Sequence, residues 1–207
     1  MLWIILGILI SYLIGSIPTA YIFGRALKRI DIRKFGSGNV GATNALRVLG
    51  KPAGIVVLVL DILKGFVTVF FLGNIIVARI TGISDITTRV LLGLSCICGH
   101  NWTIFLKFKG GKGMATTLGV LLGLTVKVAG LKLIFALVIL TWLVVFIITR
   151  IVSLASILSG ITLPVYMFLF KQPRILICSS VLLSMFIILR HKSNLKRIFE
   201  GKEPRLF

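Results

Sequence analysis

Acidic residues are scarce in this chain of 207 residues, where five Asp and Glu stand against 24 Lys and Arg. The five are Asp31, Asp61, Asp85, Glu200 and Glu203. So few carboxylates cannot supply the clusters that bind two catalytic metal ions, or the relays that carry protons through membranes. The composition therefore argues against carboxylate-driven chemistry, and we expect neither a metal site nor a cofactor.

Cysteines are also few, namely Cys96, Cys98 and Cys178. Each lies in an apolar run, and their spacing is typical of small apolar helix residues, not of a disulfide framework or a metal site. Hydrophobic residues, by contrast, make up 57% of the chain even before its 21 glycines are counted. Soluble domains reach about 45–50% with glycine included, so an ordinary soluble domain is excluded.

Seven apolar segments have a length close to the roughly 20 residues that cross a bilayer. They are residues 2–24, 52–78, 90–106, 114–126, 133–149, 151–170 and 175–189. The fourth is short, which indicates a half-length or partly buried helix. We therefore predict an all-α integral membrane protein with seven transmembrane helices, in which residues 1–207 form a single membrane-embedded domain.

The distribution of the cations predicts the orientation, because Lys and Arg accumulate in cytoplasmic loops. If all seven segments cross, 17 of the 24 Lys and Arg lie on one side and six on the other, with Lys64 inside the second segment. This arrangement places the N-terminus outside and the C-terminus in the cytoplasm. The net charge of +19 then reflects membrane topology, and we expect the lipid bilayer as a partner and no nucleic acid.

The first of three polar stretches on the predicted cytoplasmic side is GSGNVGATNALRVLG, residues 36–50. Residues 42–49 are predicted to form a helix with Gly50 as its C-cap. Asn44 and Arg47 then share one helix face that is suited to an anion. Ser37, Asn39 and Thr43 offer further hydrogen bonds. The alternative is a plain connecting loop whose glycines make turns.

The second stretch is GHNWTIFLKFKGGKGMATTLG, residues 99–119. Its centre, with Lys107, Gly110, Gly111, Lys112 and Gly113, leads directly into the apolar fourth segment. Consecutive glycines before a helix N-terminus favour phosphate binding, because backbone N–H groups and the helix dipole point to the anion. The spacing does not match the nucleotide-binding pattern GxxxxGK[ST], which argues against an NTPase. A basic loop that touches lipid headgroups is the alternative.

The third stretch is HKSNLKRIFEGKEPR, residues 191–205. His191, Asn194 and Arg197 would lie along one side of a short helix. We expect Glu200 and Glu203 to pair with neighbouring cations and not to act as bases. Taken alone, this stretch is also typical of the basic flank that follows a last transmembrane helix.

Within the second apolar segment, Asp61 and Lys64 are three residues apart, and we expect them to form a structural ion pair, because an unpaired charge in the membrane is costly. Arg150 and Ser153 lie at the joint of the fifth and sixth segments and could complete the same polar pocket. Many phosphate-binding donors without a carboxylate pair suit an acyl phosphate, whose phosphate leaves without a general acid. The attacking hydroxyl could lose its proton to a substrate phosphate oxygen or to a His.

The three stretches, in this order and separated by apolar segments, resemble the three motifs of the bacterial acyl-phosphate-dependent glycerol-3-phosphate acyltransferases. The resemblance extends over essentially the whole chain, including DILKG at 61–65 and RIVSLASI at 150–157. It implies a multi-pass inner-membrane acyltransferase whose active site faces the cytoplasm. Such an enzyme moves a fatty acyl group from acyl phosphate to the 1-hydroxyl of glycerol 3-phosphate, giving lysophosphatidic acid for phospholipid synthesis. A soluble enzyme that supplies the donor is a possible partner.

The resemblance also implies roles for individual residues. The catalytic residues would be Ser37, Arg47, His191 and Asn194. The substrate-binding residues would be Asn39, Thr43, Asn44, Lys107, Gly110, Gly111, Lys112, Gly113 and Ser153, and the structural residues Asp61, Lys64, Glu200 and Glu203.

Other patterns bear on the alternatives. The His-x4-Asp pattern of soluble-type acyltransferases is absent, since Phe105 stands five residues after His100. Two functions of other classes remain open: a transporter for an organic anion, and a non-catalytic membrane subunit that binds anionic lipid.

Overall fold

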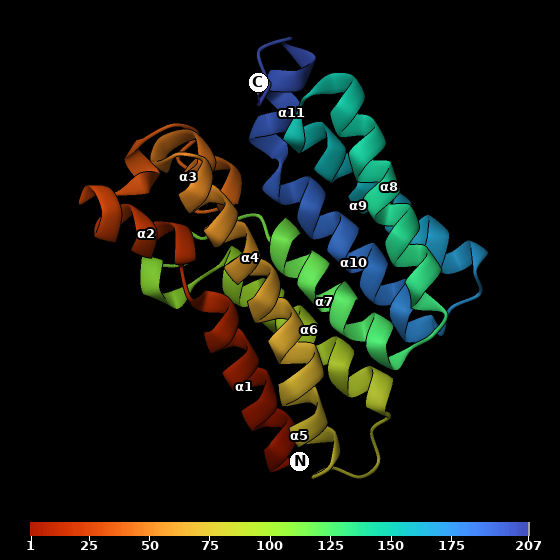
Figure 1. The fold of residues 1–207 in the computed structure, drawn as a ribbon. Helices are drawn as coiled ribbons and strands as arrows, with labels where there is room; N and C mark the ends of the chain where they lie inside the picture. Colours follow the sequence, from red (N-terminus) through yellow and green to blue (C-terminus); the bar gives the residue numbers. More distant parts are fainter. Residues whose placement is uncertain (207) are drawn as a thin grey trace. The chain divides into compact units, whose positions relative to one another are not determined.

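The computed structural model describes residues 1–206, whose regular secondary structure is entirely helical (Figure 1). In these residues five segments are long and apolar enough to cross a membrane, namely Leu2–Lys28, Lys51–Val77, Asp85–Leu106, Leu131–Thr149 and Val152–Leu169. The pair Arg174–Arg190 and Lys192–Phe199, bent by 61°, is a sixth candidate, and Met114–Lys127 is a shorter apolar helix. The all-helical membrane class is thus confirmed, while the number of seven crossings stays a prediction.

The chain divides into two compact units, Met1–Lys127 and Val128–Phe207. The expected single domain is not tested by this division and stays a prediction. The first unit contains α1 (Leu2–Ser16), α2 (Thr19–Lys28), η1 (Ile32–Lys34), α3 (Ala42–Leu49), α4 (Lys51–Val67), η2 (Thr68–Leu72), α5 (Gly73–Val77), α6 (Asp85–Asn101), η3 (Ile104–Leu106) and α7 (Met114–Lys127). The second contains α8 (Leu131–Thr149), α9 (Val152–Leu169), α10 (Arg174–Arg190) and α11 (Lys192–Phe199).

The long helices of the first unit pack as two close pairs, α1 with α6 and α4 with α7 (Figure 1). Glycines make this approach possible. A Cβ on Gly15 or Gly99 would overlap a backbone oxygen across the α1–α6 pair, and one on Gly65 or Gly119 would do so across the α4–α7 pair. Small residues allow such backbone contact between membrane helices, where lipid offers no hydrophobic driving force for packing.

The first apolar segment is broken, which corrects the expectation of one helix over residues 2–24. Helix α1 ends at Ser16 and α2 begins at Thr19, because Pro18 lacks an N–H group and disfavours the helical conformation at Ile17. Lys64 Nζ donates to the carbonyl of Ile17 at 3.2 Å, so a buried cation satisfies a backbone group that the break exposes.

The expected ion pair in α4 is present and is attached to this break. Lys64 Nζ lies 2.8 Å from Asp61 Oδ1, and both side chains are buried. Thr19, the first residue of α2, donates its hydroxyl to the same carboxylate oxygen at 2.5 Å. Asp61 and Lys64 therefore join α4 to both sides of the interruption between α1 and α2.

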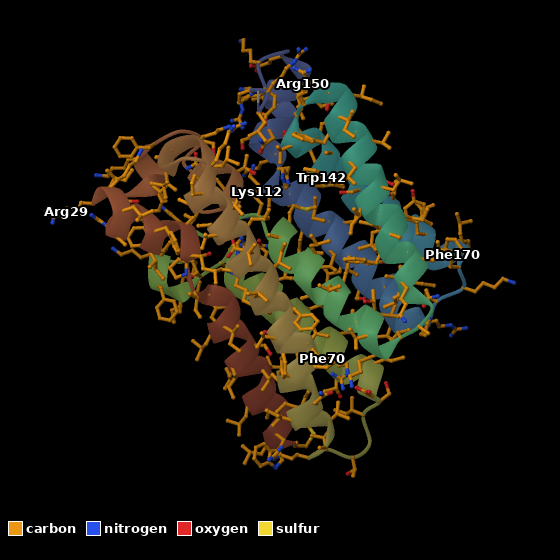
Figure 2. The ribbon with its side chains drawn as sticks, viewed as in Figure 1. Arg29, Phe70, Lys112, Trp142, Arg150 and Phe170 are labelled. Carbon is orange, nitrogen blue, oxygen red and sulfur yellow. The ribbon has the colours of Figure 1, made fainter. Side chains whose placement is uncertain are left out.

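A second irregularity is the π-helical segment η2, which contains Phe70 (Figure 2). The guanidinium of Arg89 on α6 is buried against it. Nη1 of Arg89 donates to the carbonyl of Val69 at 2.7 Å, and Nη2 donates to Asn74 Oδ1 at 2.8 Å. Arg89 also pairs with Asp85 one turn earlier in α6. A cation thus supplies donors to the carbonyls of a wider helical turn.

In the second unit, α9 packs against both α8 and α10. Polar side chains contribute to the α8–α9 contact. Trp142 Nε1 donates to Ser156 Oγ at 3.3 Å, and the hydroxyls of Thr141 and Tyr166 lie 2.9 Å apart. Figure 2 labels Trp142 on α8. Such contacts satisfy polar groups inside a helix pair that is otherwise apolar.

Candidate active site

Residues 36–44 of the first unit form a tight loop before α3. The structure confirms the predicted helix Ala42–Leu49, which ends at Gly50 with φ of 98°. Gly36 and Gly38 have φ of 58° and 69°, a conformation that favours glycine, and they bracket Ser37. Ser37 and Arg47 are both exposed. The loop therefore presents a hydroxyl and a guanidinium at the surface of this unit.

Asn44 holds this loop together from inside. Its amide nitrogen donates to the carbonyls of Phe35 at 3.1 Å and Asn39 at 3.0 Å, and it lies 3.3 Å from the carbonyl of Ile32. Its Oδ1 accepts from the Ser37 N–H at 2.9 Å. Only 1% of the residue is exposed. Asn44 therefore shapes the loop and orients Ser37, whereas the sequence indicated a residue that faces a ligand.

The glycine-rich loop, residues 107–113, packs against the end of α6. As predicted, a helix begins directly after it, with α7 starting at Met114. The Gly110 N–H donates to the carbonyl of Asn101 at 3.2 Å and the Gly111 N–H to that of His100 at 3.0 Å. These two amides therefore bind protein carbonyls and do not point into an open concavity. Lys112 is half-buried beside the start of α7 (Figure 2), and Lys107 is exposed.

An apolar cluster brings the two loops to the same end of the first unit. Leu106, the last residue of η3 and directly before the glycine-rich loop, is 5% exposed. It belongs to a buried cluster formed by the elements around residues 36–44: Ala20, Ile32, Val40, Ala45 and Val57. The first two polar stretches therefore rest on one shared core, as residues of one site would.

The sequence did not single out two further polar residues near the start of α7. Asn101, at the end of α6, and Thr116, in the first turn of α7, have buried side-chain atoms without a hydrogen-bond partner within residues 1–206. Gly113 lies against Asn101 Oδ1 and has φ of 78°. Asn101 is a polar residue in the apolar stretch around GHNW, which could have indicated it. Its neighbours His100 and Trp102 are residue types more often associated with a site or a membrane interface.

In the second unit, Glu203 gathers the polar residues of the third stretch. Its Oε1 accepts from Ser153 at 2.7 Å and from Asn194 at 2.5 Å, and its Oε2 accepts from Arg197 at 2.7 Å. Burial raises the pKa of Glu203, but these hydrogen bonds outweigh it, so the pKa lies below its ordinary value. Glu200 instead lies at the surface beside Lys196 and Lys202. Of the two candidate acids, Glu203 thus makes the structural contacts.

His191 is buried at the turn between α10 and α11. Its Nδ1 lies 2.8 Å from the carbonyl oxygen of Ile187. A carbonyl can only accept, so Nδ1 carries the proton. In the neutral ring the lone pair then belongs to Nε2.

All five acidic residues of the chain form ion pairs. Asp31 pairs with Arg33, Asp61 with Lys64 and Asp85 with Arg89, while the two Glu pair with residues of α11 and the tail. The side-chain hydrogen bond from Arg33 lowers the pKa of Asp31 to about 2. A carboxylate held by a cation is a poor general base.

Comparison with known proteins adds an independent line of evidence. The family model described as glycerol-3-phosphate acyltransferase matches residues 5–201. Glycerol-3-phosphate acyltransferases of Staphylococcus aureus, strains JH9 and Newman, are each 45% identical over 204 residues, which cover 98% of both chains.

Two crystal structures of PlsY, an integral membrane glycerol 3-phosphate acyltransferase, are similar over 98% of this chain and 94% of theirs. The glycerol 3-phosphate form is 36% identical with a TM-score of 0.84, and the lysophosphatidic acid form is 35% identical with a TM-score of 0.81.

Proposed function

The chain belongs to the glycerol-3-phosphate acyltransferase family, and on that premise we propose that it moves a fatty acyl group from an acyl phosphate to the 1-hydroxyl of glycerol 3-phosphate. The hydroxyl oxygen attacks the acyl carbon, the bond from that carbon to the phosphate oxygen breaks, and the hydroxyl proton passes to His191 or to a substrate phosphate oxygen. The products are lysophosphatidic acid and inorganic phosphate. The PlsY structures support this assignment, since one contains glycerol 3-phosphate and the other lysophosphatidic acid.

The observation that carries the choice of donor is the pairing of every carboxylate with a cation. A donor with a poor leaving group needs a general acid from the enzyme to protonate that group. An acyl phosphate does not, because phosphate is already a weak base. The enzyme then needs to hold two phosphorylated substrates in place and to stabilise the oxyanion. Such a reactive anhydride must be supplied by another enzyme, and we propose a soluble one.

The contacts within each unit support distinct roles. In the first, Lys112 and the N-terminus of α7 are suited to a phosphate, because a cation and a helix dipole both favour an anion. Ser37 and Arg47 are exposed at the same end of that unit. In the second, His191 presents Nε2 as a base, while Ser153 and Asn194 are held by Glu203. We assign both sets of residues to the same reaction.

The reaction is tested with purified protein, glycerol 3-phosphate and palmitoyl phosphate, with lysophosphatidic acid measured by mass spectrometry. We expect product with this donor and none with palmitoyl-CoA or palmitoyl carried by acyl carrier protein. Product from palmitoyl-CoA alone would contradict the assignment of acyl phosphate as the donor. No product from any donor would contradict the proposed acyltransferase activity.

We further propose seven crossings of the plasma membrane, with the polar stretches facing the cytoplasm. Helix α7 runs opposite to α6, since Gly93 lies against Val120 whereas Gly113 lies against Ile97. This reversal supports a crossing by α7, although it has only 14 residues.

The topology is tested in a variant without Cys96, Cys98 and Cys178. Single cysteines at Lys171 and Lys196, both exposed, are then probed with an impermeant maleimide on intact cells. We expect labelling at 171 and protection at 196. The reverse pattern would mean that α7 does not cross.

A further inference from the structure

His100 lies between the buried ion pair of α4 and the glycine-rich loop. It is next to last in α6, and only 7% of it is exposed. Its Nδ1 is 3.8 Å from Asp61 Oδ1, which is a packing contact and not a hydrogen bond. Its carbonyl accepts the N–H of Gly111. His100 therefore lies against the Asp61–Lys64 ion pair on one side and the glycine-rich loop on the other.

The Asp61–Lys64 ion pair of α4 is rigid because it also contacts α2 and the residue that follows α1. Asp61 Oδ1 accepts from Thr19 of α2 and lies 2.8 Å from Lys64 Nζ. Lys64 in turn donates to the carbonyl of Ile17 at the end of α1. A carboxylate with these partners, 1% exposed, has little freedom to move. The imidazole of His100 thus packs against a fixed charge.

On its other side, the imidazole occupies the space that a side chain at position 111 would need. A Cβ on Gly111 would overlap His100 Nε2 and would lie 2.9 Å from both Cδ2 and Cε1. Position 110 differs in an informative way. A Cβ there would overlap the backbone carbonyl oxygen of His100 and would lie 2.9 Å from that of Asn101. Glycine at 111 is thus dictated by the side chain of His100, and glycine at 110 by its backbone.

We propose that His100 is a positioning residue for glycerol 3-phosphate. Its imidazole, packed between Asp61 and Gly111, sets the position of the glycine-rich loop and thereby the affinity for this substrate. The proposal rests on the proposed function, which assigns the loop and Lys112 to the substrate phosphate. A positioning role of this kind acts on binding and leaves the chemical step largely intact.

The test is a double-mutant cycle. His100→Asn keeps a polar group near Asp61 but removes the ring atoms that lie over Gly111. We expect this variant to raise the KM for glycerol 3-phosphate about tenfold, with kcat and the KM for palmitoyl phosphate nearly unchanged. In the wild-type background Gly111→Ala should raise the same KM by a similar factor. In the His100→Asn background Gly111→Ala should add almost nothing, because the clash is gone.

Gly110→Ala is the matched control, because its clash is with a backbone carbonyl that His100→Asn retains. We expect it to be equally harmful in both backgrounds. If Gly111→Ala costs the same factor in both backgrounds, or if His100→Asn leaves the KM unchanged, the proposal is wrong. Should His100→Asn fail to fold in detergent, the same cycle with His100→Ala decides the question. The wild-type assay tests the proposed function separately, since it depends on none of these variants.

Discussion

Asn194 on α11 donates its amide to Glu203 Oε1 at 2.5 Å, while Ser153 on α9 donates to the same oxygen. One carboxylate, 4% exposed, therefore connects two helices and the C-terminal tail of the second unit. This contact distinguishes Glu203 from Glu200, which lies at the surface among lysines.

Glu203→Gln should destabilise the second unit by about 1.5–3 kcal/mol, because a charged acceptor of three hydrogen bonds is lost. Turnover should fall with it, since Asn194 and Ser153 lose their orientation. Glu200→Gln is the control, and it should change the free energy of unfolding by less than about 0.5 kcal/mol, as expected for an exposed pair. Thermal unfolding in detergent measures both, and equal effects would contradict the structural role.

The lowered pKa of Glu203 predicts how its contribution depends on pH. A carboxylate whose folded pKa lies below its unfolded value of about 4.3 stabilises the fold fully above that value. The contribution is lost as pH falls through the folded pKa. The difference in Tm between wild type and Glu203→Gln should therefore be constant from about pH 7 to 5 and shrink below about pH 4. A difference that is unchanged at low pH would contradict this.

Ser37→Ala should reduce turnover by at least about 100-fold without affecting membrane insertion, because Ser37 is exposed and its side chain is not part of the fold. Ser193→Ala, also exposed, is the control and should retain activity. The assay is the release of inorganic phosphate from palmitoyl phosphate. Near-normal turnover in Ser37→Ala would remove Ser37 from the site.

His191→Ala should likewise abolish turnover if Nε2 accepts the hydroxyl proton. A base must be unprotonated to accept that proton, so wild-type kcat should also fall toward acid pH. A flat profile from about pH 5.5 to 8, together with residual turnover in the variant, would contradict this role.

Asp61→Asn should destabilise the first unit by about 3–5 kcal/mol, because it leaves the buried ammonium of Lys64 without its counter-charge. The double variant Asp61→Asn/Lys64→Met removes both charges and should recover much of the loss. The melting temperatures of the single and double variants decide between these outcomes. A double variant less stable than the single one would show that the pair is not the source of the effect.

Arg89→Gln should destabilise the first unit by about 3 kcal/mol, since the carbonyls of η2 lose a buried cationic donor. Arg79→Gln provides the comparison, because Arg79 is an exposed cation that donates to the carbonyl of Ile75. Its substitution should cost less than about 0.5 kcal/mol. The KM for glycerol 3-phosphate should stay near the wild-type value in both. Equal thermal stability of the two variants would contradict the role of Arg89.

Local patterns were sufficient wherever a feature depends on residues close in the chain. The helix Ala42–Leu49 with its C-cap Gly50, the start of α7 at Met114 and the pairing of Asp61 with Lys64 follow from spacing, glycine positions and the cost of a buried charge. The break at Ile17–Pro18 had a local signal in Pro18, but the apolar run on both sides concealed it. No local pattern indicated which of Glu200 and Glu203 makes the structural contacts, since both follow α11 among cations.

The sequence by itself determined that this is an all-helical membrane protein, which residues form its three polar stretches and which family it resembles, because hydropathy, charge bias and motif order are properties of the chain. Only the tertiary structure decided which side chains those stretches contact. Asn44 binds its own loop, Gly110 and Gly111 bind the end of α6, and His100 lies between Asp61 and Gly111. The reason is physical: a hydrogen bond or a steric exclusion between residues far apart in sequence depends on distances that exist only once the helices have packed.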